Sequence, residues 1–244
     1  MKLYYPNHIF SDVTFAGTTN EVATLPKENV GAIHSKKLWR TNASGSVAMT
    51  MTPTSSQSFQ FFAVIRKTAY TPTQFKYGTS SSSTTTVLYS SMSSYGLIDY
   101  YERPTNFAGA QYYTWEWTAS VNDDTGVIFA SPAITLSQDI DSGGLTIEHV
   151  DKSSTSESHS GEIFAEAGAT YRQFKANWSN ADNYLKESLE ALYNSVGLHT
   201  PFFTQLSTVT PYNEMLYVQL IEPPAFSAGS FGRWSAELTF QDAQ

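Results

Sequence analysis

Residues 171–196 read YRQFKANWSNADNYLKESLEALYNSV, and this stretch changes from the periodicity of a strand to that of a helix. In residues 171–178 apolar side chains alternate with polar ones, which is typical of a strand with one buried face. From residue 181 to residue 196 apolar side chains recur every three or four positions and form one stripe of a helix. The stripe consists of Ala181, Tyr184, Leu185, Leu189, Leu192 and Val196. A helix of about 24 Å is too short to be stable alone, so we expect this stripe to pack on a sheet.

Both ends of this helix carry recognisable signals. Ser179 is followed three residues later by Asp182, which fits a capping box in which each side chain satisfies an unpaired backbone N–H. Gly197 can adopt the left-handed conformation that commonly ends a helix. The sequence therefore predicts a helix over residues 181–196.

Three further strands are predicted after the helix, over residues 200–206, 215–221 and 233–241. The second reads MLYVQLI and is apolar on both faces, as expected of a central strand. The third alternates strictly, and its apolar face consists of Trp234, Ala236, Leu238 and Phe240. Two prolines and two glycines in residues 223–232 predict a loop without strands. We expect a small C-terminal sheet or barrel with one α-helix packed across it.

The sequence before residue 150 has the periodicity of a sandwich. Residues 46–150 contain about six to eight turn-bounded segments that alternate like strands, which is typical of a β-sandwich or jelly roll. Residues 60–66 read QFFAVIR and are apolar throughout, as in a central strand. The sequence NDDTG at residues 122–126 is a hairpin signal, so residues 127–133 are expected to pair back on the strand before it.

The predicted fold class is mainly β, with three parts along the chain. Residues 1–150 are expected to form a β-sandwich. Residues 151–160 read DKSSTSESHS and contain no apolar side chain, which predicts a polar linker or loop. Residues 161–244 are expected to form the strand–helix–strand unit.

Composition excludes several classes of function. Hydrophobic residues make up 41% of the 244 residues and aromatic residues 14%, enough for a packed core. The net charge of −8 and the lack of a basic cluster argue against nucleic-acid binding. There is no cysteine, so disulfides and thiolate metal sites are excluded, which is consistent with a reducing cytoplasm. No apolar run approaches 18 residues, and Pro6 and His8 interrupt any leader-like start, so membrane insertion is not expected.

No catalytic motif is visible in the sequence. The five histidines are His8, His34, His149, His159 and His199. They form no HExxH pattern, and neither a nucleophile elbow nor a phosphate-binding glycine loop occurs. A catalytic group assembled only in three dimensions stays open as an alternative, but we expect no enzyme and no cofactor.

Asp139 and Asp141 lie two residues apart and are followed by Gly143 and Gly144. Calcium loops use this spacing because alternate residues point oxygens at one cation. The distal glutamate of such a loop is missing, because Glu148 is too near. We therefore favour an Asp/Gly turn, with Asp139 and Asp141 as weak candidates for metal ligands.

Aromatic side chains suggest two kinds of surface. Trp115 and Trp117 share a strand face and suit either a sugar-stacking platform or a core, and the core is favoured. Tyr95, Tyr100 and Tyr101 are expected in a loop, where they are candidates for contact with a glycan or another subunit.

Residues 127–240 resemble a family of bacteriophage tail proteins. The resemblance rests on the segments VIFASPAITLSQDID, YRQFKANWSN, ADNYLKESLEALYNSVG, TPFFTQL, MLYVQLIEPP and GRWSAELTFQD. In the last segment the family pattern falls on Trp234, Leu238 and Phe240. Upstream, LWRTN, VAMTMT and FQFFAVIRK resemble the opening strands of a galactose-binding-like jelly roll. The order of the two units is reversed relative to distal tail proteins, which leaves open a neighbouring minor tail protein.

This resemblance implies a structural virion protein of the tail or baseplate, assembled in the host cytoplasm. It implies a homo-oligomeric ring that contacts tube and hub proteins, because ring closure covers strand edges. Within the predicted loop, Phe226, Phe231 and neighbouring Arg233 are the candidates for subunit contact. The alternative function is a carbohydrate-binding or receptor-binding module that recognises a host surface glycan through the jelly roll.

Overall fold

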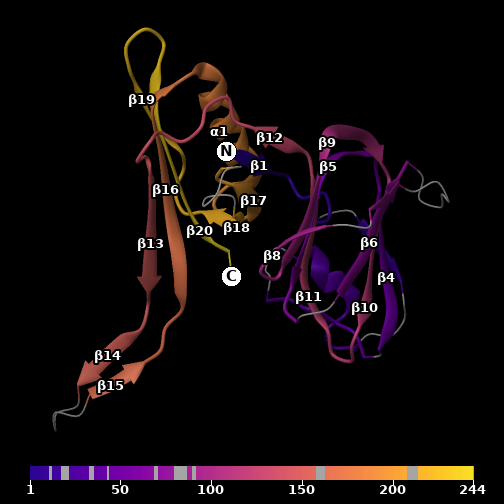
Figure 1. The fold of residues 1–244 in the computed structure, drawn as a ribbon. Helices are drawn as coiled ribbons and strands as arrows, with labels where there is room; N and C mark the ends of the chain where they lie inside the picture. Colours follow the sequence, from indigo (N-terminus) through magenta and orange to yellow (C-terminus); the bar gives the residue numbers. More distant parts are fainter. Residues whose placement is uncertain are drawn as a thin grey trace.

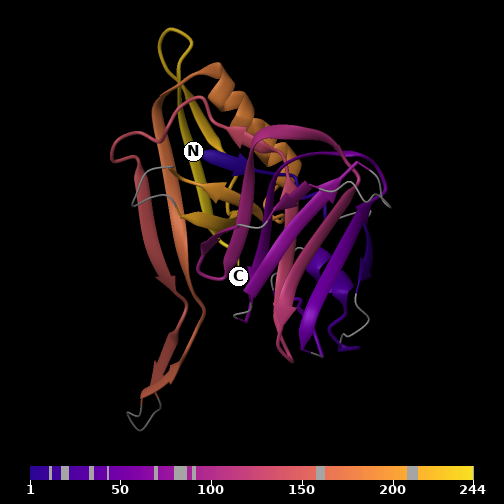
Figure 2. The same ribbon diagram turned by 45° about the vertical axis from the view of Figure 1, so that its right-hand side comes forward.

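The computed structural model describes residues 1–10, 13–17, 22–32, 36–42, 44–68, 71–79, 87–89, 92–157, 163–207 and 214–243. These residues are mainly β and contain one α-helix, arranged in four layers: helix, large sheet, inner sheet and outer sheet (Figures 1 and 2). The predicted fold class is therefore confirmed. Within the described ranges no helix has the length and apolar character needed to span a bilayer.

The inner and outer sheets form the sandwich. The outer sheet has the order β2 (Val13–Gly17), β4 (Gly45–Pro53), β10 (Tyr112–Ala119), β6 (Thr71–Gly78) and β7 (Val87–Tyr89). The inner sheet has the order β3 (Trp39–Arg40), β11 (Asp124–Ser131), β5 (Gln57–Arg66), β9 (Ile98–Ala110) and β8 (Ser93–Tyr95). A 3-10 helix, η1 (Lys27–Gly31), packs against β11.

Aromatic side chains fill the space between the two sandwich sheets. Trp115 and Trp117 are both almost fully buried there, and Trp117 meets Trp39 edge to face at 4.9 Å. The prediction that this pair of tryptophans belongs to the core is thus confirmed. Phe62 of the central strand β5 stacks on Phe75 of the opposite sheet, with the ring centroids 3.6 Å apart.

The hairpin expected at residues 122–126 is wrong. Strand β10 pairs with β4 and β6, whereas β11 pairs with β3 and β5, so the turn carries the chain from one sheet to the other. The Asp123 carboxylate accepts a hydrogen bond from the backbone N–H of Ser120, and Asn122 has a φ of 68°. The turn residues thus fix a reversal, but they do not determine which strands become neighbours.

The large sheet has the order β12-β1-β17-β18-β20-β16-β13, and β19 pairs with β20. Its strands are β1 (Lys2–Tyr4), β12 (Ala133–Thr135), β13 (Leu145–Asp151), β16 (Thr170–Ala181), β17 (Phe202–Gln205), β18 (Met215–Leu220), β19 (Ala225–Ala228) and β20 (Trp234–Asp242). Since β1, β12 and β13 belong to this sheet, the expected division at residue 150 is wrong. The sandwich is inserted between β1 and β12.

Helix α1 (Asn183–Val196) covers one face of the large sheet. Leu185, Leu189, Leu192 and Val196 are buried against it, and Gly197 ends the helix at a φ of 57°, as predicted. The N-terminal cap differs: the Asp182 carboxylate accepts a hydrogen bond from the Leu185 N–H at 2.7 Å, while β16 continues through Ser179. Two residues of the predicted apolar stripe do not belong to the buried face of α1. Ala181 is the last residue of β16, and the Tyr184 side chain is exposed.

The opposite face of the large sheet packs on the inner sheet of the sandwich. Strand β18 shows both contacts: Leu216 and Val218 face the helix, whereas Met215 and Tyr217 face the sandwich. This confirms the prediction of a central strand with two buried faces. Tyr4 of β1 stacks on Phe61 of β5, with the ring centroids 3.9 Å apart. The two units therefore share a continuous aromatic interface.

A two-stranded ribbon extends from β13 and β16 away from the body, where the polar linker was expected (Figure 1). Its outer part, which we call the arm (residues 152–169), contains β14 (Ser154–Glu157) paired with β15 (Ile163–Glu166). The linker prediction is wrong for residues 151–157; residues 158–160 lie outside the described ranges. A polar sequence is also what a two-stranded ribbon with water on both faces requires.

The segment 223–232 also contains a strand that was not predicted. Strand β19 pairs with the start of β20 and forms a hairpin that projects beyond α1 (Figure 1). Pro223 and Pro224 precede the strand, and Gly229 and Gly232 lie in its turn. The prolines and glycines therefore lie at the two ends of a strand, and they do not exclude a strand between them.

Candidate functional site

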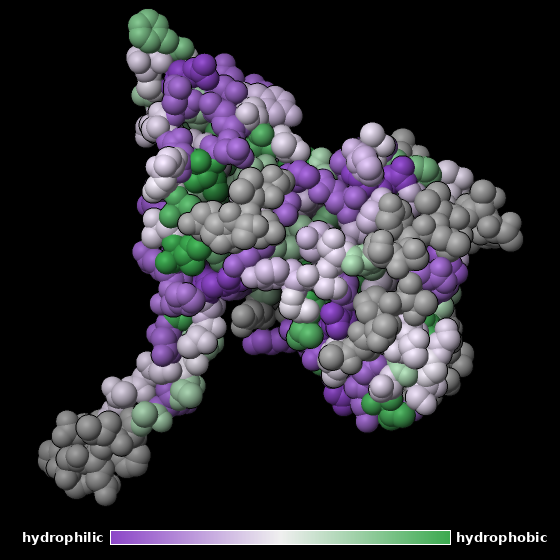
Figure 3. Space-filling model, in the orientation of Figure 1, coloured by the Kyte–Doolittle hydropathy of each residue, from purple (hydrophilic) through white to green (hydrophobic). Residues whose placement is uncertain are grey.

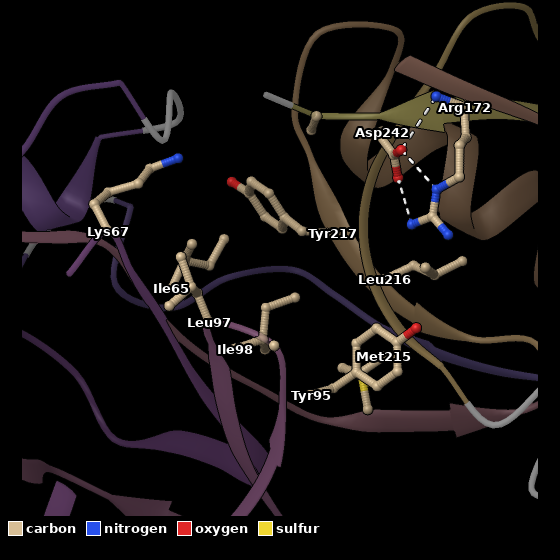
Figure 4. A pocket seen from close by; sticks show the side chains of 12 residues that line it. Ile65, Lys67, Tyr95, Leu97, Ile98, Arg172, Met215, Leu216, Tyr217 and Asp242 are labelled. Carbon is tan, nitrogen blue, oxygen red and sulfur yellow. Dashed lines mark hydrogen bonds and ion pairs between the residues drawn. The ribbon is translucent and has the colours of Figure 1, made fainter. Parts of the chain in front are cut away.

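A groove of about 240 Å³ lies where the sandwich meets the large sheet (Figure 4). The sandwich contributes the end of β5 and the turn between β8 and β9, and the large sheet contributes β18 and residues of β16 and β20. Its lining is Ile65, Lys67, Tyr95, Gly96, Leu97, Ile98, Arg172, Met215, Leu216, Tyr217, Asp242 and Ala243. Seven of these are large apolar or aromatic residues, so the groove is an apolar surface with charged groups at its edges.

A buried ion pair positions the sandwich wall of the groove. Arg66 donates to Asp99 Oδ1 from Nη2 at 3.0 Å, and the Asp99 side chain is fully buried. Ser94 Oγ donates to the same oxygen at 2.6 Å, and the Arg66 N–H donates to the Leu97 carbonyl at 2.8 Å. These bonds tie the β8–β9 turn to the end of β5, so Tyr95 and Leu97 are held over the groove.

The wall from the large sheet carries a charged cluster centred on Arg172. Its Nε donates to Asp242 Oδ2 at 3.0 Å and its Nη1 donates to Glu214 Oε2 at 2.8 Å. Burial alone would lower the pKa of the Arg172 guanidinium, but the hydrogen bonds to Asp242 and Glu214 raise it above its ordinary value. The cluster holds two carboxylates for one guanidinium, so this wall is negative.

Two more titratable groups border the groove. Burial raises the pKa of the Tyr95 hydroxyl, and its hydrogen bond to Glu214 adds to the rise. Burial lowers the pKa of the Lys67 ammonium on the sandwich side, and the charge of Lys36 lowers it further. No pair of groups among the described lining residues is arranged as acid and base across a reacting position.

The structure separates the three tyrosines that were predicted as glycan contacts. They lie on the β8–β9 hairpin, and the expected loop is wrong. Tyr95 lines the groove and is 41% exposed. Tyr100 packs against the core between the two units, while Tyr101 packs against the core of the sandwich. Tyr95 is thus the member of this group that is available to a ligand.

Asp139 and Asp141 occupy neighbouring positions but make separate bonds. Asp139 pairs with the amino group of Met1 at 2.9 Å, and Asp141 accepts from the Ser179 N–H at 2.5 Å. In the part of the chain that the structure describes, no three acidic or histidine side chains gather as a metal site would require. The metal candidates therefore receive no structural support there.

The histidines are dispersed. His8 Nε2 lies 2.8 Å from the carbonyl oxygen of Ser58, and this bond requires the proton on Nε2. His149 and His199 are exposed on the large-sheet unit. His34 and His159 lie outside the described residues.

The predicted subunit contacts lie on the β19–β20 hairpin. Phe226 is half-buried, and the Lys186 ammonium lies 5.6 Å from its ring centroid. Phe231 is completely exposed in the turn, and Arg233 is exposed beside it. In the surface view the tip of this hairpin is hydrophobic and stands clear of the body (Figure 3).

Comparison with known proteins gives a limited result. The sequence matches no family model and no curated protein. A selenomethionine-labelled mutant of chitosan-binding module 1, from a chitosanase/glucanase of Paenibacillus sp. IK-5, is similar with a TM-score of 0.45 and 16% identity, over 52% of this chain and 100% of that chain. SpGH29 has a TM-score of 0.45 and 11% identity, over 54% of this chain and 29% of that chain. CpGH89CBM32-6, produced by Clostridium perfringens, has a TM-score of 0.39 and 13% identity, over 51% of this chain and 98% of that chain. At these scores the likeness carries no argument about function.

Proposed function

We propose that this chain is a non-catalytic structural protein that assembles with copies of itself, as a distal or minor tail protein in the tail or baseplate of a long-tailed phage. The observation that carries the proposal is the arm. The phage setting comes from the resemblance of residues 127–240 to tail proteins. Tube and hub proteins are the further partners that this resemblance implies.

The arm side chains that the structure describes lack the packing that an isolated ribbon needs for stability. Ser154, Thr155 and Ser156 of β14 and Ala165 and Glu166 of β15 are all exposed. A two-stranded hairpin without a packed face is at best marginally stable in water. Contact with another chain would supply the missing packing, so a protruding ribbon of this kind favours assembly.

An open sheet edge supports the same proposal. Strand β13 ends the strand path of the large sheet, so within the described ranges one of its edges has no neighbouring strand. Its residues Thr146, Ile147, Glu148 and His149 are exposed. A strand edge of seven residues is a template for pairing with another chain, and assembly is one way to cover it.

Removal of the arm tests this proposal. Asp151 and Thr170 are paired residues at the end of the β13–β16 ladder, so an Asn-Gly turn can replace residues 152–169. We expect the full chain to assemble with rising concentration in sedimentation velocity, and the arm-deleted chain to stay a folded monomer. Circular dichroism provides the control for folding. A full chain that is monomeric at all concentrations, and absent from purified virions by mass spectrometry, would contradict the proposal.

Carbohydrate binding is the second candidate, and the position of Tyr95 favours it. The exposed ring of Tyr95 lies beside the Arg172–Asp242 pair, and sugar sites combine an aromatic ring with charged hydrogen-bonding groups. We expect a glycan array to identify a sugar whose binding is lost in Tyr95→Ala and kept in Tyr184→Ala, an exposed tyrosine elsewhere. An array without signal for the folded protein would reject this candidate.

A further inference from the structure

We propose that Phe231 of one copy inserts into the groove of a neighbouring copy and contacts Tyr95 and Leu97 there. This inference rests on the proposed self-assembly and names a second contact, beside that of the arm, which the assembly requires. The hairpin tip is an exposed anchor, and the groove is an apolar surface open to solvent. Contacts within one chain explain neither the exposure of the hairpin tip nor the apolar surface of the groove.

The first step is the unusual state of Phe231. Its side chain is 101% exposed and its φ is 57°, in the left-handed region that bulky residues rarely adopt. The next residue, Gly232, also has a positive φ of 70°, and the Gly229 N–H donates to the Arg233 carbonyl at 2.8 Å. The turn is therefore closed by a hydrogen bond and presents the ring outward. Residues in such sparsely populated backbone conformations cluster at functional sites, where the surrounding structure holds the strain.

The second step is the character of the groove. Leu97 is 44% exposed and Tyr95 is 41% exposed on one wall, while Met215 and Tyr217 form part of the other. Filling the groove with a phenyl ring would remove Leu97 and Phe231 from water together, which is favourable. The tyrosine rings can also meet the incoming phenylalanine edge to face. The predominance of apolar lining favours this occupant over a sugar.

The third step is charge. Arg233 is exposed two residues after Phe231 and would approach the groove with it. The large-sheet wall carries Glu214 and Asp242 around the single guanidinium of Arg172, so it has one carboxylate in excess. Lys67 lies on the opposite, sandwich wall. The incoming arginine would thus meet the negative wall, which fixes the orientation of the contact.

The fourth step shows that the contact is made between copies. Trp234 begins β20 close to the hairpin tip, and Asp242 ends it in the groove. Nine residues of strand separate these ends by about 26 Å, so Phe231 cannot reach the groove of its own chain while the sheet is intact. The hairpin tip lies at one end of β20 and the groove lies at the other, so the contact between two copies is head to tail. Repetition of such a contact gives a closed ring or an open filament.

Crosslinking tests the inference directly, because the chain contains no cysteine. One protein carries Ser230→Cys, which is exposed beside Phe231 and leaves the phenyl ring in place, a second carries Leu97→Cys, and the two are mixed and oxidised mildly. We expect a covalent heterodimer in at least about tenfold excess over a control mixture, in which Val121→Cys replaces Leu97→Cys. Val121 is a comparably exposed apolar residue of the sandwich, outside the groove. Equal yields in the two mixtures would overturn the inference.

A second measurement separates this inference from the proposed function. Sedimentation velocity is compared for the wild-type chain and for Phe231→Ser. Assembly of the wild type with loss of assembly in Phe231→Ser supports both proposals. Equal assembly of the two proteins overturns the Phe231 contact and leaves the structural function standing. A wild type that is monomeric at all concentrations overturns the Phe231 contact and, if the chain is also absent from purified virions, the proposed function as well.

Discussion

Arg66 and Asp99 form an ion pair that is withdrawn from solvent beneath the groove, with side-chain exposures of 9% and 0%. Asp99 is shared by the guanidinium of Arg66 and the hydroxyl of Ser94, so it joins β5 to the β8–β9 hairpin. Both residues of the pair are needed, because each would be a costly buried charge without the other.

Asp99→Ala is therefore expected to lower the free energy of unfolding by about 3 to 5 kcal/mol, since it leaves Arg66 buried without its main partner. Urea denaturation measures this loss. The matched control is Glu190→Ala in the partly exposed Lys186–Glu190 pair of α1, with an expected loss of about 0.3 to 0.5 kcal/mol. If the two substitutions have equal effects, the pair does not stabilise the fold as we infer. The double variant Arg66→Met, Asp99→Leu should recover most of the loss.

Gly168 allows the two strands to approach closely at the point where the β13–β16 ribbon continues into the arm. A Cβ at this position would lie 2.1 Å from the backbone carbonyl carbon of Lys152, so any side chain forces the two strands apart. We expect Gly168→Ala to leave the unfolding midpoint unchanged, because the arm contributes nothing to the cores. Assembly should fall clearly, and amide exchange in the arm should accelerate. Ser153→Ala removes one hydrogen bond to the Gly168 N–H and should have a smaller effect. An unchanged exchange rate in Gly168→Ala would argue against this close approach of the strands.

His8 is expected to make stability depend on pH. Burial lowers its pKa in the folded protein, and the hydrogen bond to Ser58 offsets part of this change. As pH falls below about 6.5, the unfolded chain takes up the proton first, so stability declines until the folded-state pKa is passed. Above that range His8 is neutral in both states and has no effect. The difference in unfolding midpoint between about pH 7.5 and about pH 5.5 should shrink in His8→Gln, and an equal difference in both proteins would refute the assignment.

Phe231→Asn separates the stability of the chain from its assembly. Asparagine tolerates a positive φ better than phenylalanine, and the left-handed conformation costs roughly 1 to 2 kcal/mol for ordinary residues. We expect the thermal midpoint to stay the same or rise slightly while assembly is lost. At a concentration where both proteins are monomeric, so that assembly does not contribute to the midpoint, a drop in the midpoint would mean that Phe231 packs within its own chain. Differential scanning fluorimetry and sedimentation velocity on the same sample distinguish these outcomes.

Local periodicity was sufficient to predict several elements. The alternation around Trp178 and the stripe around Leu189 predicted β16 and α1, because each pattern depends on neighbours in sequence. The apolar run of β18 likewise predicted a strand covered on both faces. The capping residue was missed because Ser179 and Asp182 both suit the role, and the tertiary bond between Gln138 and the Asp182 N–H is not visible in sequence.

Pairings between distant strands and the groove itself could not be predicted. Residue Arg172 is 42 positions from Glu214 and 70 positions from Asp242, and no spacing rule connects them. The sheet positions of β1 and β11 depend on long-range hydrogen bonds that leave no trace in local pattern. Tyr95 was identified as an accessible aromatic residue, but the opposite wall of its groove, with Met215, Leu216 and Tyr217, comes from another sheet.

The place of β1 in the large sheet has a consequence for synthesis on the ribosome. Lys2 of β1 pairs with Gln205 of β17, so the first strand to emerge has no neighbour on that side until some 200 residues later. At about 5 to 20 residues per second this wait is roughly 10 to 40 s. The sandwich can condense during that interval. The large sheet is then completed by residues 202–242, which close over a domain that has already formed.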